Sequence, residues 1–286
     1  MTDSAEAPFV RVGPERPVSP VVLSVPHAGR AYSPALLRAA RLPRETLETL
    51  EDRLVDRLIW RAVDAGATAF IACAPRAEID LNRDEREIDP SLISPPLPSA
   101  AIIDSPRARG GIGLIPSRLV GSGAIWKARI ERDELVRRIV EIHQPYHAAL
   151  ERALKAARDR FGAALLLDCH SMPAGAGSDG ATIVFGDRYG TTIAPHLVEA
   201  AVDAVEGLGY RTARNAPYAG GYVTGRHGRP GEAIHALQIE IDRAVYLDMD
   251  LRAPGTGFAD ACRMVEAVVG ALEDTLIGPA QTLAAE

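Results

Sequence analysis

The most constraining feature of this 286-residue chain is an apolar run that leads directly into three polar or reactive side chains. Residues 164–167 are Ala-Leu-Leu-Leu, and Asp168, Cys169 and His170 follow at once. A run that is apolar at every position is typical of a parallel strand covered by helices on both faces. Because side chains alternate along a strand, we expect Asp168 and His170 to share one face at its carboxyl end, where open α/β sheets bind ligands.

Strand-like and helical patterns alternate along the rest of the chain. Apolar or alternating runs predict strands at residues 21–25, 67–72, 181–185 and 235–242. Apolar residues at helical spacing predict helices at residues 44–65, 127–161, 191–208 and 257–277. Pro145 predicts a kink or break within the second of these helices. The alternation predicts an α/β fold with a largely parallel or mixed central sheet.

The length of the chain favours one domain with a substantial core. We expect this domain to span residues 21–278. The Pro-rich residues 1–20 are expected to form a flexible lead-in, and residues 279–286 a C-terminal tail.

The composition is that of an ordinary soluble globular protein and excludes several classes of partner. Apolar residues make up 47% and charged residues 24%, and the net charge is −6 at pH 7. Because Arg and acidic residues are interspersed, the chain lacks the basic footprint of a nucleic-acid-binding protein. No stretch approaches the ~20 apolar residues of a membrane span, and the first twenty residues do not have the pattern of a signal peptide.

The cysteine pattern indicates a reducing compartment. Cys73, Cys169 and Cys262 lie far apart and form no Cys-x-x-Cys pair, so neither a disulfide framework nor a thiolate zinc site is expected. We therefore expect a cytoplasmic protein that binds neither nucleic acid nor membranes. The sequence leaves its oligomeric state open.

A second histidine also follows an apolar run. His27 comes directly after Val-Val-Leu-Ser-Val and Pro26, and is followed by Ala28 and Gly29. Small residues at such a turn allow a metal or ligand to approach the backbone closely. The alternative is that this segment is only a turn, just as a lone histidine at a strand end is often structural.

A carboxylate near the core boundary is predicted within residues 44–65. Asp52 and Asp56 are four residues apart on one stripe of the expected helix, which continues with apolar residues. A buried carboxylate needs a partner, and a metal ion is one. The alternative is a solvated pair neutralised by Arg53 and Arg57.

Three further segments carry polar side chains suited to binding. Asn82 and Arg83 offer an amide and a planar fork of donors for a carboxylate or a polarised carbonyl. Residues 90–123 and the glycine-rich residues 215–231 lack a period, which is typical of lids and binding loops. Strict alternation over residues 235–242 directs Glu240 away from the apolar face.

His143 and His147 have the spacing of a helical zinc motif but not its residues. Position 144 is Gln rather than the Glu of His-Glu-x-x-His, and Pro145 intervenes. We therefore interpret His143 as a surface or packing residue. His147 is interpreted as a packing residue or as one that supports a ligand from behind.

Together these residues are the parts of a mononuclear zinc hydrolase. Catalytic zinc takes three nitrogen or oxygen ligands and keeps one position open for water. A separate Glu then accepts the proton of that water, and an Arg stabilises the developing oxyanion.

The ordered motifs resemble the N-formylglutamate amidohydrolase family, in the wider zinc carboxypeptidase and aspartoacylase-like group. They are SVPHAG, EDRLVD, IDLNRD, PYHAAL, LLLDCHSMP, GDRYG, PYAGGYVTGRHGRPG and HALQIEI. The resemblance implies a three-layer α/β/α, phosphorylase/hydrolase-like fold and one divalent metal ion, usually Zn²⁺. It also implies hydrolysis of the formamide of N-formyl-L-glutamate, a small anionic substrate, to formate and glutamate.

The resemblance also implies roles for individual residues. His27 and His170 match metal ligands, Glu240 matches the base, and Asn82-Arg83 matches the pair that holds a substrate carboxylate in the related aspartoacylases. The glycine-rich segment contributes Tyr222, Arg226 and His227 as candidate substrate-binding residues. That segment is one of the motifs that the chain shares with the family.

The chain departs from the related carboxypeptidases at the acidic ligand. Those enzymes place it three residues after the first histidine, where this chain has Arg30. Asp52 is the best replacement, with Asp56 and Asp168 behind it. Two other functions stay open: a related zinc hydrolase for another N-acyl amino acid or small peptide, and a non-catalytic binding protein on the same fold.

Overall fold

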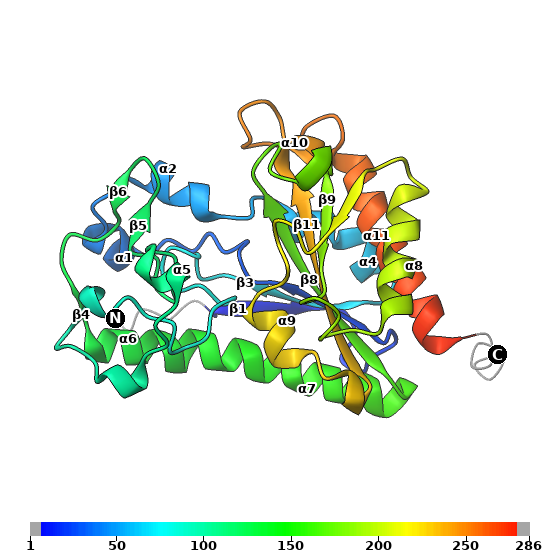
Figure 1. Cartoon of the computed structure of the whole chain (residues 1–286), viewed down its shortest axis with the longest axis horizontal. Coiled ribbons are helices and arrows are strands. Elements are labelled where there is room, and N and C mark those ends of the chain that lie inside the picture. The colour runs from blue at the N-terminus through cyan, green and yellow to red at the C-terminus, as the bar shows by residue number, and fades with distance from the viewer. Residues whose placement is uncertain (1–6, 279–286) are drawn as a thin grey trace. The chain divides into compact units, whose positions relative to one another are not determined.

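A mixed sheet of seven strands organises the computed structural model, which describes residues 7–278 (Figure 1). The strand order is β1-β3-β2-β8-β11-β9-β10. These strands are β1 (Phe9–Val12), β2 (Val21–Val25), β3 (Thr68–Ala72), β8 (Ala164–Met172), β9 (Ile183–Gly186), β10 (Thr212–Arg214) and β11 (Ile234–Asp242). β8 runs parallel to β2 and β11, whereas β9 is antiparallel to β11. The predicted α/β class with a mixed sheet is confirmed.

The centre of the sheet is formed by β2, β8 and β11, which are buried along almost their whole length. Every residue of β2 and β8 is buried, and so is every residue of β11 except His235. In the register of these strands Ser24 lies opposite Asp168, and Glu240 lies opposite His170. The packed leucines and valines thus fix the strand register, and the register determines which polar side chains lie next to one another.

Contacts divide the chain into two compact units. One consists of Arg11–Val25, Asp52–Phe70 and the residues from Ala149 onward. In this unit α4 (Trp60–Asp64), α8 (Pro195–Glu206) and α11 (Phe258–Ile277) lie along one side of the sheet, and α9 (Tyr222–His227) packs against β8 and β11. It also contains α3 (Val55–Leu58) and α10 (Arg243–Tyr246).

The other unit consists of the residues up to Val10, Pro26–Glu51 and Ile71–Ala148. Two small sheets lie in it, β4 (Ile93–Ser94) with β7 (Ile130–Glu131) and β5 (Arg118–Leu119) with β6 (Gly123–Ala124). Its helices are α1 (Pro34–Ala39), α2 (Arg44–Leu47), α5 (Pro106–Arg109), α6 (Arg132–Arg138) and the first part of α7 (Gln144–Phe161). The domain boundaries expected at residues 20 and 278 stay a prediction, and the expected tail at 279–286 lies outside the described residues.

The single helix predicted for residues 44–65 is wrong. The segment consists of α2, a 3₁₀ turn at Glu48–Leu50, α3 and α4, with a non-helical stretch before α3. Leu54 has φ 62°, in the left-handed region, and an α-helix cannot continue through such a residue. Asp52 therefore lies in the break and not on a helical stripe with Asp56, although both side chains are buried.

The break predicted at Pro145 takes another form. A π-helical turn at Ile139–His143 comes immediately before it, and α7 continues through the proline to Phe161. A proline lacks the N–H of an α-helical hydrogen bond and its ring crowds the preceding turn. A widened turn at this place accommodates both effects. The start of the segment also differs, because Ile130–Glu131 forms β7.

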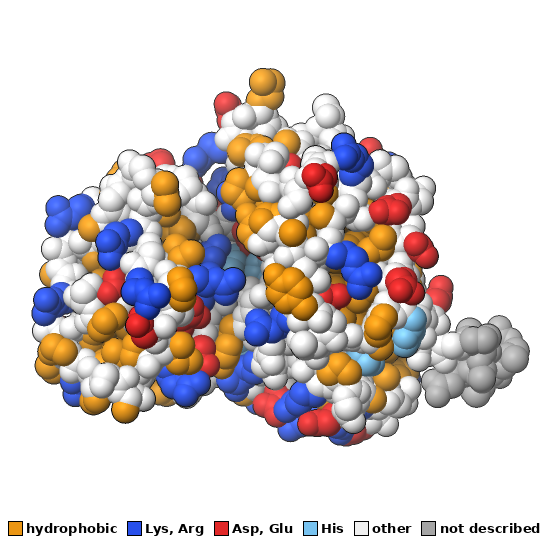
Figure 2. Space-filling model, in the orientation of Figure 1, with side chains coloured by type: hydrophobic (Ala, Val, Ile, Leu, Met, Phe, Trp, Pro, Cys, Tyr) orange, Lys and Arg blue, Asp and Glu red, His pale blue; other side chains and the backbone are white. Residues whose placement is uncertain are grey.

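Sequence patterns missed several short elements, among them β1, β10 and α9. β1 lies within the expected lead-in, β10 has only three residues, and α9 lies within the glycine-rich residues 215–231 that were expected to be a loop. These elements are too short for a periodic pattern to identify. Within residues 7–278 no helix combines the length and apolar character needed to cross a bilayer. The face drawn in Figure 2 carries Lys and Arg interleaved with Asp and Glu, without a continuous basic patch.

We predict that His227 makes the protein less stable in mild acid. It exposes 1% of its surface, and burial, together with the nearby charge of Arg226, lowers its pKa to about 3. Between this value and the ~6.5 of an unfolded histidine, the unfolded chain binds a proton that the folded chain refuses, so stability falls as the pH falls. Comparing pH 7.5 with pH 5, His227→Gln should lose about 1–2 kcal/mol less free energy of unfolding than the wild type.

Urea unfolding at the two pH values measures this difference. His196→Gln is the control, because His196 is exposed on α8. Equal pH dependence in the wild type and His227→Gln would show that His227 does not carry this effect.

Candidate metal centre

Strand β8 places a histidine between two carboxylates. Asp168 and His170 share one face of the strand, as predicted, and His170 Nε2 lies 2.8 Å from Asp168 Oδ2. On its other side, His170 Nδ1 lies 2.9 Å from Asp52 Oδ2. All three side chains are buried. Both ring nitrogens are therefore engaged by acidic groups.

Further contacts hold the two carboxylates in place. The hydroxyl of Ser24, opposite Asp168 in the register, donates to Asp168 Oδ1 at 2.7 Å. Arg243, the first residue of α10, lies with its Nη2 3.4 Å from Asp52 Oδ1 and donates from Nε to Ser171 Oγ at 3.1 Å. Each carboxylate thus contacts His170 through one oxygen and a supporting residue through the other.

The electrostatics of His170 suit a bound cation. Burial disfavours a charged imidazole, but the carboxylates of Asp168 and Asp52 outweigh this effect and raise the pKa of His170 well above its usual range. When the proton between His170 Nδ1 and Asp52 Oδ2 is lost, both of these atoms can ligate a metal ion. The donors present here are those that divalent metals of the zinc type prefer.

His27 is supported in a similar way by a carboxylate that the sequence analysis overlooked. It follows β2 by two residues, and its Nε2 lies 2.7 Å from Asp80 Oδ1. Asp80 also accepts from the backbone N–H of Asn82 at 2.8 Å and from Arg76 Nε at 2.9 Å. The side chains of His27 and Asp80 are buried.

Asp80 is anionic in this setting. Burial opposes its charge, but Arg76, His27 and Arg83 together hold the pKa of the Asp80 carboxyl well below its usual range. A carboxylate on Nε2 fixes the tautomer of His27 and leaves Nδ1 for a metal. The sequence offered one signal for it, since Asp80 stands two residues before Asn82 in the same motif.

Close backbone approach next to His27 depends on glycine. A Cβ on Gly29 would lie 1.9 Å from the carbonyl oxygen of Ala74. No side chain fits at that distance, so the turn after His27 packs against residues 73–74 only because Gly29 is there. The segment Pro26-His27-Ala28-Gly29 is therefore a packed turn that presents a histidine, which combines the two interpretations of the sequence.

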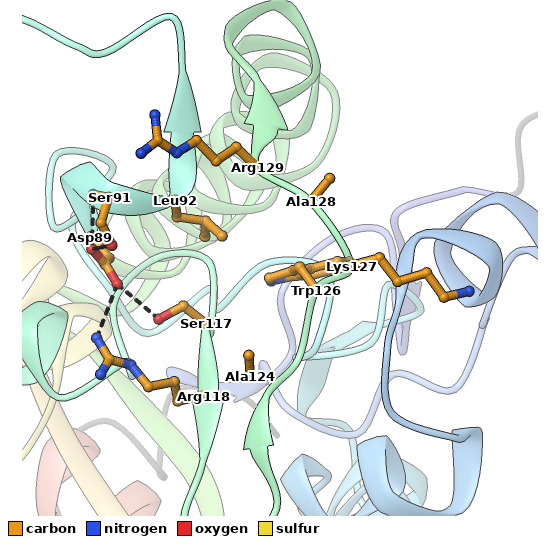
Figure 3. A pocket seen from close by; sticks show the side chains of 10 residues that line it. All are labelled: Asp89, Ser91, Leu92, Ser117, Arg118, Ala124, Trp126, Lys127, Ala128 and Arg129. Atoms are coloured by element: carbon orange, nitrogen blue, oxygen red, sulfur yellow. Dashed lines mark hydrogen bonds and ion pairs between the residues drawn. The ribbon is translucent and has the colours of Figure 1, made fainter.

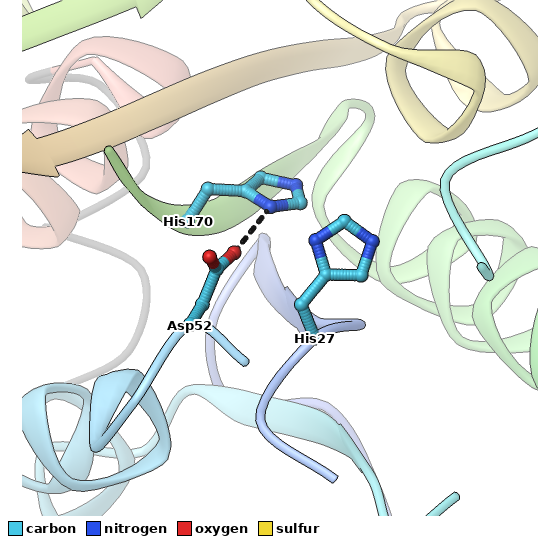
Figure 4. A group of neighbouring side chains, drawn as sticks. All are labelled: His27, Asp52 and His170. Atoms are coloured by element: carbon cyan, nitrogen blue, oxygen red, sulfur yellow. Dashed lines mark hydrogen bonds and ion pairs between the residues drawn. The ribbon is translucent and has the colours of Figure 1, made fainter. Parts of the chain in front are cut away.

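His27, Asp52 and His170 form a group that could hold a metal ion (Figure 4). Each offers one ligand atom, and these atoms lie within 4.8 Å of one another. Among the described residues the group contains Asp52, and neither Asp56 nor Asp168 belongs to it. The set of two histidines and one carboxylate fits the donor set of a catalytic zinc site.

Glu240 lies on the strand next to His170. Its side chain exposes 7% of its surface, and its Oε1 accepts a hydrogen bond from Gln238 Nε2 at 2.8 Å. Glu240 also contributes to the raised pKa of His170. Glu240 is therefore a buried carboxylate outside the group of possible metal ligands, and it is a candidate general base.

The Asn82-Arg83 pair is buried, and Arg83 is held by backbone carbonyls. Arg83 Nε donates to Ile112 O and Nη1 donates to Asn82 O, both at 2.9 Å. Burial lowers the pKa of Arg83, partly offset by Asp80. Arg83 is thus a cation held in a fixed position.

The candidate substrate residues of the glycine-rich segment lie on α9. Arg226 is exposed, donates from Nη1 to Tyr222 Oη at 2.6 Å and stacks over the Tyr222 ring. His227 is buried, so it faces the protein interior. Arg229 lies near Glu151 and Glu232. Their contact with a substrate stays a prediction.

The two histidines of the rejected zinc motif are packing residues. His143 and His147 are buried, and their Nε2 atoms lie 2.8 Å from Arg83 O and 3.0 Å from Leu81 O. They therefore hold the backbone of residues 81–83 in place. These contacts fit the packing interpretation of His147, and a role in supporting a ligand stays a prediction.

A pocket of about 440 Å³ lies elsewhere, beside β5 and β6 (Figure 3). Its buried carboxylate, Asp89, is satisfied by Ser91 and Ser117. Lys127 extends away from the other lining residues and donates to Arg38 O. None of the predicted site residues lines this pocket, so it is not the candidate site.

Comparison with known proteins identifies the family to which this chain is related. A model of the N-formylglutamate amidohydrolase family matches residues 19–247. An N-formylglutamate deformylase of Pseudomonas aeruginosa is 30% identical over 271 residues, which cover 90% of this chain and 92% of the relative. The enzyme of the same name from Pseudomonas putida is 31% identical over 241 residues, which cover 80% and 82% of the two chains.

A solved structure is similar over nearly the whole chain. The crystal structure of N-formylglutamate amidohydrolase from Ralstonia eutropha JMP134 aligns with a TM-score of 0.88 and 35% identity. The alignment covers 95% of this chain and 99% of that one. The chain therefore belongs to the N-formylglutamate amidohydrolase family.

Proposed function

We propose that this protein is a metal-dependent amidohydrolase that cleaves the formamide of N-formyl-L-glutamate to formate and L-glutamate. The observation that carries the proposal is the buried group of His27, Asp52 and His170, with a carboxylate on the far nitrogen of each histidine. Membership of the family supports the substrate, since two relatives bear the name N-formylglutamate deformylase.

We propose that His27, Asp52 and His170 are the ligands of one divalent metal ion and that this ion is Zn²⁺. Asp80 and Asp168 would orient the two imidazoles, because a carboxylate on the second nitrogen fixes the tautomer of a ligating histidine. A metal held there supplies Lewis acidity, which lowers the pKa of a water molecule and polarises a carbonyl group.

The side chains of the site account for the remaining steps of hydrolysis. Glu240 would accept a proton as water attacks the formyl carbon, forming the new C–O bond. Arg83 would donate to the oxygen that becomes negative. As the C–N bond breaks, Glu240 would return the proton to the nitrogen of glutamate. The products are then formate and glutamate, and the base is restored.

Substrate choice would depend on arginine side chains that bind carboxylates and on the size of the pocket for the acyl group. N-formylglutamate carries two carboxylates, and Asn82-Arg83 and Arg226 with Tyr222 offer donors for them. Formyl is the smallest acyl group, so a pocket closed around it would reject larger acyl groups sterically. This places specificity in the residues that surround the metal ligands.

We predict that one variant loses metal binding and that another loses only proton transfer. His27→Ala should bind less than one metal equivalent and lose hydrolysis, because one ligand is missing. Glu240→Gln should keep the metal but lose about 10²–10⁴-fold in kcat, because an amide cannot accept the proton. Metal analysis of the purified protein and kcat with N-formylglutamate measure both.

His196→Ala is the control and should keep both metal and activity, because His196 is exposed on α8. Full activity of His27→Ala at full occupancy would contradict the ligand assignment. Unchanged kcat in Glu240→Gln would assign the base to another residue.

We also predict that the enzyme prefers the dicarboxylate. The kcat/KM for N-formylglutamate should exceed those for N-formylglutamine and N-acetylglutamate. Arg83→Ala should lose most of the preference for the acid over the amide, since a fixed guanidinium recognises a carboxylate through paired donors. Arg86→Ala is the matched control, because Arg86 is exposed and pairs with Asp84 in the same segment.

These compounds and a panel of other N-formyl and N-acyl amino acids should be assayed with metal-loaded enzyme. A better neutral substrate would point to the alternative of another N-acyl amino acid. Metal binding without any hydrolysis would point to a binding protein.

A further inference from the structure

Glu240, the candidate base, contacts Gln238, and the amide of Gln238 is held in place by a second hydrogen bond. Gln238 lies two residues before Glu240 on β11, so the two side chains project from the same face. Gln238 Nε2 donates to Glu240 Oε1 at 2.8 Å, and Gln238 Oε1 accepts from the backbone N–H of Gly221 at 2.9 Å. Both hydrogen bonds are buried.

The chemistry of these groups leaves one orientation for the amide. A backbone N–H only donates, so the atom that faces Gly221 must be the oxygen of Gln238. The NH₂ group then faces Glu240 and must find an acceptor there. An ionised carboxylate only accepts, and this matches the state that a general base needs before it takes a proton.

The backbone at Gly221 is itself fixed. Its carbonyl oxygen accepts from Arg188 Nη1 at 3.1 Å and from Thr224 Oγ1 at 3.0 Å, and Arg188 N donates to Ala219 O at 2.7 Å. Gly186 on β9, opposite Gln238 in the register, has room for this segment only because it lacks a side chain. A Cβ there would lie 2.5 Å from Gly220 N.

We propose that Gln238 is a positioning residue for the reaction: its amide, held by the Gly221 N–H, fixes the Glu240 carboxylate in the orientation that proton transfer requires. The inference rests on the proposed function, since it takes Glu240 as the base. It also links the base to the start of α9, the helix that carries Tyr222 and Arg226. Any movement of α9 on substrate binding would then reach Glu240 through one side chain.

The role of Gln238 predicts a loss in kcat rather than in binding. Gln238→Met keeps the length of the side chain but removes both hydrogen bonds. Its kcat should fall about 10–100-fold, as is usual when a group that orients a reacting residue is lost, while KM stays within about twofold. Metal content should stay at the wild-type level.

Thr192→Val is the matched control. Thr192 is buried and donates to the carbonyl of Ala236, so its replacement removes a buried hydrogen bond to the same strand. Its hydroxyl lies 3.1 Å from Asp187 O and 2.8 Å from Ala236 O, and neither partner contacts Glu240 through it. Its kcat should stay within about threefold of the wild type. An equal loss in both variants would mean that Gln238 acts only by packing, and the proposal would be overturned.

A second variant gives a signature that packing does not produce. Gln238→Glu keeps an acceptor for Gly221 but sets a second carboxylate against Glu240, which repels it unless a proton is shared. The ratio of its kcat to that of the wild type should therefore rise as the pH falls, whereas the ratio for Gln238→Met should stay flat. A pH-independent ratio for Gln238→Glu contradicts the proposal.

The experiment is completed by crystal structures of the wild type and Gln238→Met. The Glu240 side chain should leave its wild-type orientation in the variant, and an unmoved side chain overturns the proposal whatever the substrate is. The rates should be measured with the amide that the wild type hydrolyses fastest. If that amide is not N-formylglutamate, the substrate assignment fails while the role of Gln238 is still tested.

Discussion

The structure depends on one costly arrangement, a buried histidine with an acidic group on each ring nitrogen. Asp52 and Asp168 contact His170 from opposite sides, where burial alone would make charged groups unfavourable. Such a cluster persists only if a positive charge holds it together, either a proton or a metal ion. The surrounding residues, Ser24 and Arg243, satisfy the remaining oxygens. A positive charge at this position, carried by a proton or by a metal ion, is thus an electrostatic requirement of the buried cluster.

The fold positions this cluster through the register of three neighbouring strands. The apolar runs of β2, β8 and β11 set a register in which Asp168 faces Ser24 and Gln238, while His170 faces Glu240. His27 follows β2 directly, and the glycine at position 29 allows its turn to pack closely. The central strands therefore carry the proposed ligand His170, the proposed base Glu240 and the proposed positioning residue Gln238, whereas the substrate-binding candidates lie on loops and on the short helix α9.

Sequence patterns identified the features that periodic spacing and apolar runs encode. The central strands, the mixed sheet and the positions of His27 and His170 at strand ends followed from local patterns. Asp52 does lie in the group that could hold a metal ion, but its local structure was predicted wrongly, because the left-handed residue Leu54 leaves no periodic signal. Asp80 and Gln238 were overlooked because their roles depend on a partner distant in the chain. Sequence patterns report periodicity, and such pairings form only in three dimensions.

Locating the metal ion tests most directly whether His27, Asp52 and His170 are its ligands. Crystals of zinc-loaded protein, measured at wavelengths on both sides of the zinc absorption edge, give an anomalous difference map of the ion alone. We predict one peak per chain at bonding distance, about 2.0–2.2 Å, from His27, Asp52 and His170. A peak bound instead by Asp80 or Asp168, or full activity in crystals and solutions that bind no metal, would contradict the account.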